Sequence, residues 1–179
     1  MKPGEELTLG ELEKLDMGHD FKLALSRAAE GGNVYLVGPP GSGKTAMLRK
    51  LGLYLSRLGR GALYLKLEWV KYGWSLSDYV KHYGDKSRQL LGGEIGDVVL
   101  LDDGELLWGY GSAYRNIVRD VRGRQIVGAF REFDVDAATL LFGDGLTIYI
   151  QRHHAPREAA SKVPLGLAFL NKTVEITVI

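Results

Sequence analysis

A glycine-rich octapeptide constrains the fold of this chain more than any other sequence feature. Residues 38–45 read Gly-Pro-Pro-Gly-Ser-Gly-Lys-Thr and match the pattern G-x-x-x-x-G-K-[ST]. The apolar run NVYLV at 33–37 precedes the octapeptide, and leucines at helical spacing follow it. A glycine-rich loop between a strand and a helix can wrap a phosphate group with its backbone amides, at the positive end of the helix dipole. The sequence therefore predicts a phosphate-binding loop inside an α/β domain.

Short apolar runs along the chain indicate the rest of the fold. They are rich in Val, Ile, Leu and Tyr and are bounded by turn residues, as buried parallel strands are. The runs lie at 33–37, 62–67, 97–101, 146–150 and 174–179. An amphipathic helix that ends at Gly59 is expected between the first two, and this alternation favours a parallel sheet covered by helices. We expect an α/β domain over residues 21–179, preceded by a polar, loosely attached N-terminal arm at residues 1–20.

Composition excludes several classes of function. The 179 residues include 23 Lys and Arg against 22 Asp and Glu, so any contact with nucleic acid must come from a local patch rather than from overall charge. The chain has no cysteine, which excludes a disulfide framework, a zinc ribbon and thiol catalysis. The charged residues 1–20 do not form a signal peptide, and no apolar run approaches the roughly 20 residues that cross a bilayer. We expect a soluble, cytoplasmic protein without a membrane span.

The octapeptide and a later acidic segment predict binding of ATP and Mg²⁺. Lys44 is expected to reach the β- and γ-phosphates, and the hydroxyl of Thr45 to ligate Mg²⁺. The run VVLLDD at 98–103 has the form of a Walker B segment, whose Asp102 would hold the Mg²⁺ through water beside Thr45. The residues expected to bind the nucleotide are Gly38, Pro39, Pro40, Gly41, Ser42, Gly43, Lys44, Thr45 and Ala46.

Three carboxylates are candidates for the general base that orients the attacking water. Asp103 follows the Walker B aspartate directly, at the place where most ATPases of this type carry Glu. Glu105 lies two residues further on, and Glu68 follows the second apolar run. The sequence leaves these three residues open, together with the interpretation that the protein hydrolyses ATP poorly.

These motifs resemble the P-loop ATPases of the additional-strand catalytic-glutamate division, over residues 31–179. The resemblance implies the P-loop NTPase fold, a three-layer α/β sandwich with a five-stranded parallel sheet in the order 5-1-4-3-2. The five apolar runs would fill these positions in sequence, so LTIYI at 146–150 would lie between the first and third strands. A polar sensor residue is expected at the tip of that strand, near the γ-phosphate, and Gln151 stands there.

Three families of this division are similar to different parts of the chain. AAA+ proteins resemble it in the opening NVYLVGPPGSGKT and in two aromatic loops, at 69–74 and 108–111. The FtsK/HerA family of DNA pumps is similar in Gln151-Arg152 and Asn171, and RecA/KaiC-like ATPases are similar in ALYLKLE with Glu68. The chain ends at the fifth expected strand, so no C-terminal lid domain of the AAA+ kind is expected.

Basic and aromatic side chains are candidates for contacts with a macromolecule. Arg115, Arg119 and Arg122 share one face of an expected helix. They could grip DNA phosphates, reach the active site of a neighbouring subunit as an arginine finger, or form a solvated helix face. Arg152 is a further candidate for the finger. The aromatic residues of the first loop could stack on bases, push on a polypeptide, or pack on the domain. These aromatic candidates are Trp69, Tyr72 and Trp74.

The sequence thus favours an ATPase whose hydrolysis of ATP moves or remodels a macromolecule, either DNA or protein. We expect it to act as a homo-oligomer with the nucleotide bound between subunits, because no residue of the chain clearly supplies the stabilising arginine. One alternative is a nucleoside or small-molecule kinase, with an acceptor pocket within residues 104–145. Another is a slow nucleotide-gated switch or binding module, which Asp103 in place of Glu would favour.

Overall fold

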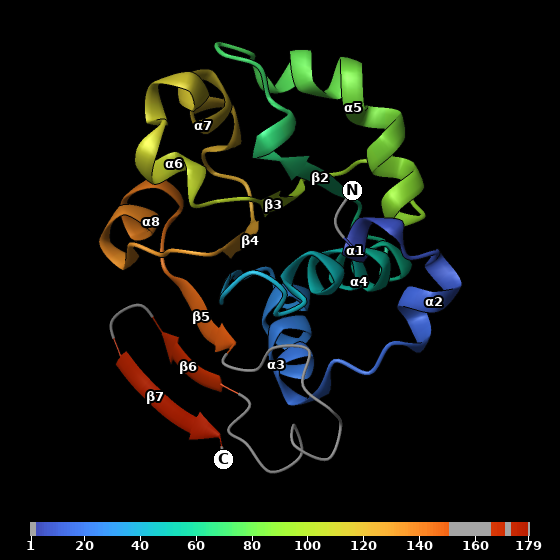
Figure 1. Ribbon diagram of the computed structural model, residues 1–179, viewed down its shortest axis with the longest axis vertical. Coiled ribbons are helices and arrows are strands. Elements are labelled where there is room, and N and C mark those ends of the chain that lie inside the picture. The colour runs from blue at the N-terminus through green and yellow to red at the C-terminus, as the bar shows by residue number, and fades with distance from the viewer. Residues whose placement is uncertain (1–2, 151–165, 171–172, 179) are drawn as a thin grey trace.

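Seven strands form one sheet in the order β2-β3-β4-β1-β5-β6-β7 (Figure 1). The computed structural model describes residues 3–150, 166–170 and 173–178. The strands are β1 Asn33–Val37, β2 Ala62–Lys66, β3 Val98–Asp102, β4 Ile126–Phe130, β5 Gly145–Ile150, β6 Gly166–Leu170 and β7 Thr173–Val178. Strands β1 to β5 are parallel to one another. Strand β6 pairs antiparallel with β5, and β7 pairs antiparallel with β6. The α/β class, the P-loop NTPase fold and the parallel order 5-1-4-3-2 expected from the sequence are therefore confirmed.

The segment that occupies the fourth position differs from the expectation. Strand β4 is IVGAF at 126–130, and it pairs with both β1 and β3. LTIYI at 146–150 belongs instead to β5, on the other side of β1. The run at 174–179 falls mainly in β7, an antiparallel strand at the edge of the sheet. A five-residue apolar run shows no periodicity that separates a strand from a buried helix, which explains why β4 was missed.

This change of strand alters the residue expected near the phosphate loop. The residue that follows the fourth strand is Arg131. The sensor was expected at Gln151 because the run at 146–150 was taken as the fourth strand, and that strand assignment was wrong. Gln151 and Arg152 themselves lie outside the described residues. The expectation that the chain ends at its fifth strand was wrong as well, because β6 and β7 follow β5 and extend the sheet.

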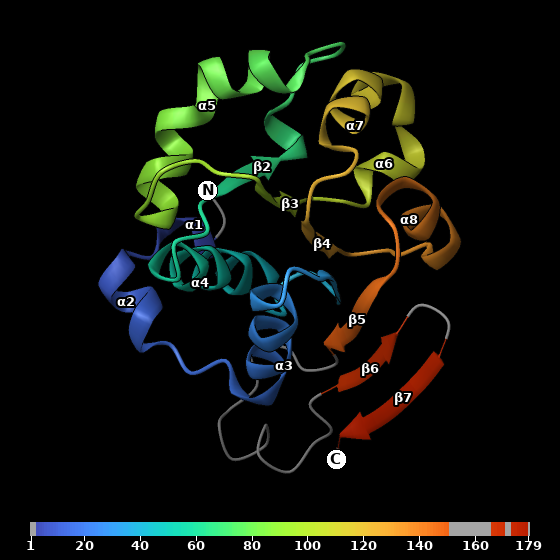
Figure 2. The ribbon, with the colours of Figure 1, turned by 180° about the vertical axis from the view of Figure 1, so that it is seen from behind.

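Helices cover both faces of the sheet and complete the three layers (Figures 1 and 2). Residues Val34 and Leu36 of β1 belong to one buried core, and Tyr35 and Val37 belong to the other. The core of Val34 and Leu36 is covered by α3 Gly18–Ala29 and α4 Lys44–Arg57. The opposite core is covered by α6 Leu106–Gly109, α7 Arg115–Val121 and α8 Val135–Phe142. Helix α5, Leu76–Leu91, packs along β2 and contributes to both cores. In the part of the chain that the structure describes, no helix has the length and apolar character to cross a membrane.

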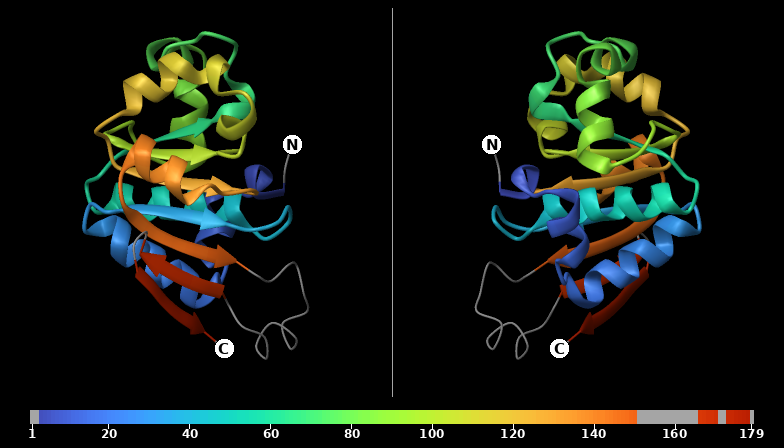
Figure 3. Two further views of the ribbon diagram at one scale, coloured as in Figure 1. Left: turned by 90° about the vertical axis from the view of Figure 1, so that its left-hand side faces the viewer. Right: turned by 90° about the vertical axis from the view of Figure 1, so that its right-hand side faces the viewer.

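The carboxyl ends of the parallel strands lie together at one edge of the sheet. Figure 3 shows the loop after β1 at this edge, and the first helix of the chain lies beside it. Helix α4 begins at Lys44 directly after that loop and buries Leu48, Leu51 and Leu55 completely. The helix predicted after the octapeptide is thereby confirmed, and it holds the loop against the sheet.

The N-terminal segment is packed on the domain, so its expected loose attachment was wrong. It forms α1 Pro3–Glu6 and α2 Leu9–Lys14, which both contact α4. The guanidinium of Arg49 donates hydrogen bonds to the carbonyl oxygens of Gly4 and Leu7 at 2.6 and 2.8 Å. Leu12 is fully buried in the core with α3 and α4. The polar composition of the segment hides these anchors, because Leu12 is the one residue of α2 that is fully buried.

The burial of Leu12 generates a testable expectation. Leu12→Ala should lower the free energy of unfolding by about 2–4 kcal/mol, because it leaves a cavity in the core. Leu15→Ala, at the exposed end of the same segment, should lower it by only about 0.5 kcal/mol. Urea denaturation followed by circular dichroism measures both values. Equally small effects of the two substitutions on the free energy of unfolding would mean that the segment does not belong to the cooperative fold.

Candidate active site

The glycine-rich loop turns sharply between β1 and α4. Gly41 and Gly43 adopt positive φ angles of 81° and 91°, which side chains rarely tolerate. A Cβ atom at Gly38 would lie 2.9 Å from the carbonyl oxygen of Ile150 and 2.9 Å from the hydroxyl of Ser42. Glycine is therefore required at these positions by the backbone path itself. The loop leads into the amino end of α4, whose first-turn amides point toward it and favour an anion there.

Lys44 places a cation inside this loop. Its ammonium donates hydrogen bonds to the carbonyl oxygens of Gly38 and Pro39, at 2.6 and 2.8 Å, and to the hydroxyl of Ser42, at 3.2 Å. The side chain is thus folded back over the loop rather than directed into bulk solvent. A positive charge in this position complements the charge of a phosphate that the loop amides bind.

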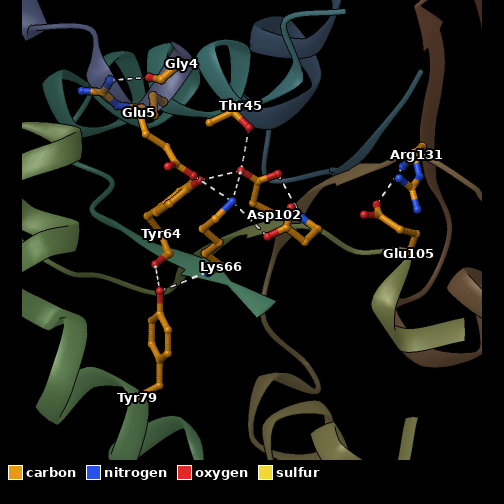
Figure 4. A network of polar contacts seen from close by, with 11 residues as sticks. Gly4, Glu5, Thr45, Tyr64, Lys66, Tyr79, Asp102, Glu105 and Arg131 are labelled. Atoms are coloured by element: carbon orange, nitrogen blue, oxygen red, sulfur yellow. Dashed lines mark hydrogen bonds and ion pairs between the residues drawn. The ribbon is translucent and has the colours of Figure 1, made fainter. Parts of the chain in front are cut away.

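The loop is joined to β3 by one hydrogen bond. The hydroxyl of Thr45 donates to the Oδ2 atom of Asp102 at 2.8 Å, and Asp102 is only 3% exposed. The same Oδ2 accepts a second hydrogen bond from the hydroxyl of Tyr64 at 2.5 Å, and Oδ1 accepts one from the backbone amide of Asp103 at 2.9 Å (Figure 4). The structure therefore brings together the two residues that the sequence proposes as Mg²⁺ ligands.

The donor set of this pair fits Mg²⁺. Hydroxyl and carboxylate oxygens are hard ligands, and Mg²⁺ in phosphate sites usually takes one or two protein oxygens, several waters and phosphate oxygens. Among the residues that the structure describes, no group of three or more His, Cys, Asp or Glu side chains is arranged as a metal cage. Thr45 and Asp102 would therefore hold the ion together with the phosphates of a nucleotide.

A buried lysine lies next to this pair and was missed by the sequence analysis. The Lys66 ammonium lies 2.8 Å from Oε1 of Glu5, 3.0 Å from Oδ2 of Asp103 and 3.9 Å from Oδ2 of Asp102 (Figure 4). Burial by itself would lower the pKa of Lys66, but Asp102, Glu5 and Asp103 outweigh it, and the pKa is raised. The ammonium stays charged and compensates these carboxylates. A lysine inside the apolar run ALYLKL is the signal that could have revealed it.

The three candidates for the general base lie in different surroundings. Asp103 is buried, adopts an unusual positive φ of 59° and pairs with Lys66. Glu105 is partly exposed, and its carboxylate accepts a hydrogen bond from the backbone amide of Arg131 at 2.8 Å (Figure 4). Glu68 lies in the 3-10 turn η1, Leu67–Trp69, and is exposed. The structure thus ties Glu105 to the tip of β4.

A cavity of about 520 Å³ opens beside the loop at the tips of β4 and β5. It is lined by Val37, Gly38, Pro39, Pro40, Arg131, Tyr149 and Ile150. Arg131 brings an exposed cation to this cavity next to the phosphate loop. The place of Arg131 beside the phosphate loop was not predicted, because the strand that precedes it was not recognised.

The two aromatic loops lie side by side, at the same end as α7. The backbone amide of Gly73 donates to the carbonyl oxygen of Ala113 at 3.2 Å, which links the first loop to the 3-10 turn Gly111–Tyr114 that follows the second. Trp69 stacks on Tyr83 and Trp74 stacks on His82, with centroid distances of 5.0 and 4.6 Å. Trp69 and Trp74 therefore pack on α5. This agrees with the alternative that aromatic residues of the first loop pack on the domain. The exposed aromatic side chains of the two loops are Tyr72, at 78%, and Tyr110, at 64%.

The expected arginine face is only partly available. Arg115 begins α7 and Arg122 follows its end, and both are exposed. The guanidinium of Arg119 pairs with the carboxylate of Asp120 at 3.1 Å. The helix is also shorter than expected, because β4 begins at Ile126. Arg115 and Arg122 remain as cations near the aromatic loops.

Some solved structures are similar to this chain. No protein-family model and no curated protein sequence matches the chain. The AMPPCP-bound DnaA from Aquifex aeolicus has 18% sequence identity and a TM-score of 0.44, over 89% of this chain and 54% of that one. A replication initiator DnaA bound to AMPPCP and single-stranded DNA has 17% identity and a TM-score of 0.48, over 87% and 54%. The RuvB Holliday junction branch migration motor of Thermotoga maritima has 22% identity and a TM-score of 0.34, over 78% and 44%. The chain spans about half the length of these proteins.

Proposed function

We propose that this protein binds and hydrolyses ATP in a Mg²⁺-dependent reaction. The observation that carries the proposal is the hydrogen bond between Thr45 of the phosphate loop and Asp102 of β3, at 2.8 Å. It joins a hydroxyl and a carboxylate next to a loop whose amides and lysine favour phosphate. A bound Mg²⁺ would neutralise charge on the β- and γ-phosphate oxygens. The loop amides and Lys44 hold the triphosphate in place for attack by water.

Glu105 is the base that the surroundings favour. Asp103 is engaged with the ammonium of Lys66 at 3.0 Å, so its carboxylate is occupied by an ion pair. Glu105 is partly exposed and is held by the Arg131 amide at the tip of β4, beside the cavity at the phosphate loop. We therefore assign Glu105 the role of orienting and deprotonating the attacking water, and Arg131 the role of a cation near the transferred phosphate. Asp103 keeps a role in holding Lys66.

The macromolecule on which this ATPase acts is proposed to be single-stranded DNA. Tyr72 and Tyr110 are exposed on neighbouring loops, and aromatic rings stack on bases of any sequence. Lys71 and Arg115 are exposed close to these tyrosines in the sequence and supply positive charge for a phosphate backbone. The homo-oligomer and an arginine supplied by a neighbouring subunit stay predictions from the sequence.

The phosphate loop is tested by Lys44→Ala. This substitution should raise the dissociation constant for a fluorescent ATP analogue at least about tenfold and abolish ATP hydrolysis, because it removes a phosphate contact. Fluorescence titration and phosphate release measure the two effects. Lys81→Ala, on the exposed side of α5, is the control and should leave both unchanged. Unaltered nucleotide affinity in Lys44→Ala would contradict the assignment of the loop.

The base is tested by comparing three isosteric substitutions. Glu105→Gln should slow single-turnover hydrolysis by roughly 100-fold, because the amide cannot accept a proton, while the affinity for ATP stays the same. Glu68→Gln serves as the exposed control and should hydrolyse ATP at the normal rate. A larger loss of rate in Asp103→Asn than in Glu105→Gln would place the base at Asp103 instead.

The DNA surface is tested at the two exposed tyrosines. Tyr72→Ala and Tyr110→Ala should each weaken binding of a fluorescein-labelled oligothymidine by about 5- to 150-fold, since base stacking contributes about 1–3 kcal/mol per base. Fluorescence anisotropy at fixed salt measures the change. Tyr72→Phe and Tyr110→Phe keep the rings and should bind normally. Equal binding of the oligothymidine by the alanine and phenylalanine variants would exclude these loops from the DNA surface. Binding of an unfolded polypeptide by the two loops would indicate a protein substrate.

A further inference from the structure

A layer of three side chains lies behind the Mg²⁺-binding pair and is not explained by phosphate binding. Tyr64, Lys66 and Glu5 are all buried, and each contacts a carboxylate of the site or the cation that holds one. They come from β2 and from the N-terminal helix α1, not from the phosphate loop or β3. Figure 4 shows that Tyr64 and Lys66 both contact Asp102, and that Glu5 contacts Lys66.

Tyr64 sets the direction of the Asp102 carboxylate. Its hydroxyl donates to the same Oδ2 atom that accepts the hydrogen bond from Thr45. The tyrosine backbone is itself held, because the hydroxyl of Tyr79 donates to its carbonyl oxygen at 2.8 Å and accepts from the amide of Lys66 at 3.0 Å. A buried hydroxyl from the middle of β2 therefore fixes the rotation of the carboxylate.

Glu5 balances the charge of Lys66. The ammonium lies 2.8 Å from Oε1 of Glu5 and 3.0 Å from Oδ2 of Asp103, so its single positive charge is shared between two carboxylates. Without Glu5, the charge of Lys66 would be compensated by the two aspartates. The Lys66 ammonium lies 3.9 Å from Oδ2 of Asp102, so its charge would then oppose a divalent cation bound to Asp102. The negative charge of Glu5 thus leaves Asp102 available to a cation.

The position of Glu5 depends on close docking of α1. A Cβ atom at Gly4 would lie 2.8 Å from the backbone nitrogen of Ala46 and 3.2 Å from the Thr45 side chain. Helix α1 therefore packs directly on the first turn of α4, where the phosphate loop ends. By contrast, a Cβ atom at Gly10 in α2 would meet nothing within 4 Å. The two glycines offer a matched pair of sites for substitution.

We propose that Tyr64, Lys66 and Glu5 are positioning residues for the Mg²⁺ site, which makes the N-terminal helix a working part of the ATPase. This inference rests on the proposed function. Side chains that orient metal ligands from behind typically change metal affinity 10- to 100-fold when they are altered. Tyr64 orients Asp102, Lys66 holds Asp103, and Glu5 offsets the charge of Lys66.

The test measures the Mg²⁺ dependence of binding of a fluorescent ATP analogue, which needs no turnover. Tyr64→Phe removes one hydroxyl and keeps the ring, and Glu5→Gln removes one charge and keeps the shape. Each should raise the Mg²⁺ concentration at half-saturation about tenfold, while affinity for the analogue in EDTA stays within about twofold. A loss in EDTA as large as that in Mg²⁺ would overturn the positioning role, because it would indicate general damage to the nucleotide site.

A second test displaces α1, and with it Glu5, without removing any polar group. Gly4→Ala should raise the half-saturating Mg²⁺ concentration as Glu5→Gln does, and Gly10→Ala should match the unsubstituted protein. Tighter binding of the analogue in Gly4→Ala or Glu5→Gln would overturn the proposal, since α1 would then compete with the nucleotide. Failure of the unsubstituted protein to bind the analogue would refute the proposed function. Normal binding by that protein, with all variants unchanged, would refute the positioning role alone.

Discussion

One buried ammonium group, that of Lys66, holds the candidate site together. It compensates Glu5, Asp103 and Asp102, whose oxygens lie 2.8, 3.0 and 3.9 Å away. Removing one partner from such a buried cluster generally costs about 3–5 kcal/mol, because a charge is left uncompensated away from water. These carboxylates come from the first helix and from the end of β3, so the ion-pair cluster joins distant parts of the sequence. The phosphate loop reaches the cluster through Thr45.

The same strand ends connect the nucleotide site with the aromatic loops. The turn η1 follows Lys66 directly, and the hydroxyl of Tyr114 donates to the carbonyl oxygen of Leu67 at 3.2 Å. The second loop follows Asp103 and Glu105 in the same way. Both loops that expose a tyrosine therefore begin at residues of the candidate site. In the proposed ATPase, this short connection gives hydrolysis a direct structural route to the surface that would contact DNA.

Environment separates residues that look alike in the sequence. Trp69 and Tyr72 belong to one aromatic loop, yet the tryptophan stacks on α5 while the tyrosine is exposed. Asp103 and Glu105 are neighbouring acids, yet one pairs with a buried lysine and the other holds the tip of β4. Residue type alone does not distinguish these cases, because burial and charge partners come from elements far along the chain. The chemical roles proposed for these residues follow from those partners.

The sequence by itself determined the phosphate loop, the helix after it, the Walker B strand and the parallel α/β class, because each depends on local pattern and spacing. It also indicated the pair of Thr45 and Asp102, since Asp102 ends one strand of the parallel sheet and Thr45 ends the glycine-rich octapeptide that follows another. Only the tertiary structure decided that the fourth strand is β4 rather than the run at 146–150, because short apolar runs are interchangeable until they pair. It likewise decided that α1 packs beside the candidate site. Nothing in the sequence distinguishes Glu5 from the other acidic residues, and its ion pair with Lys66 forms only because folding buries both side chains together.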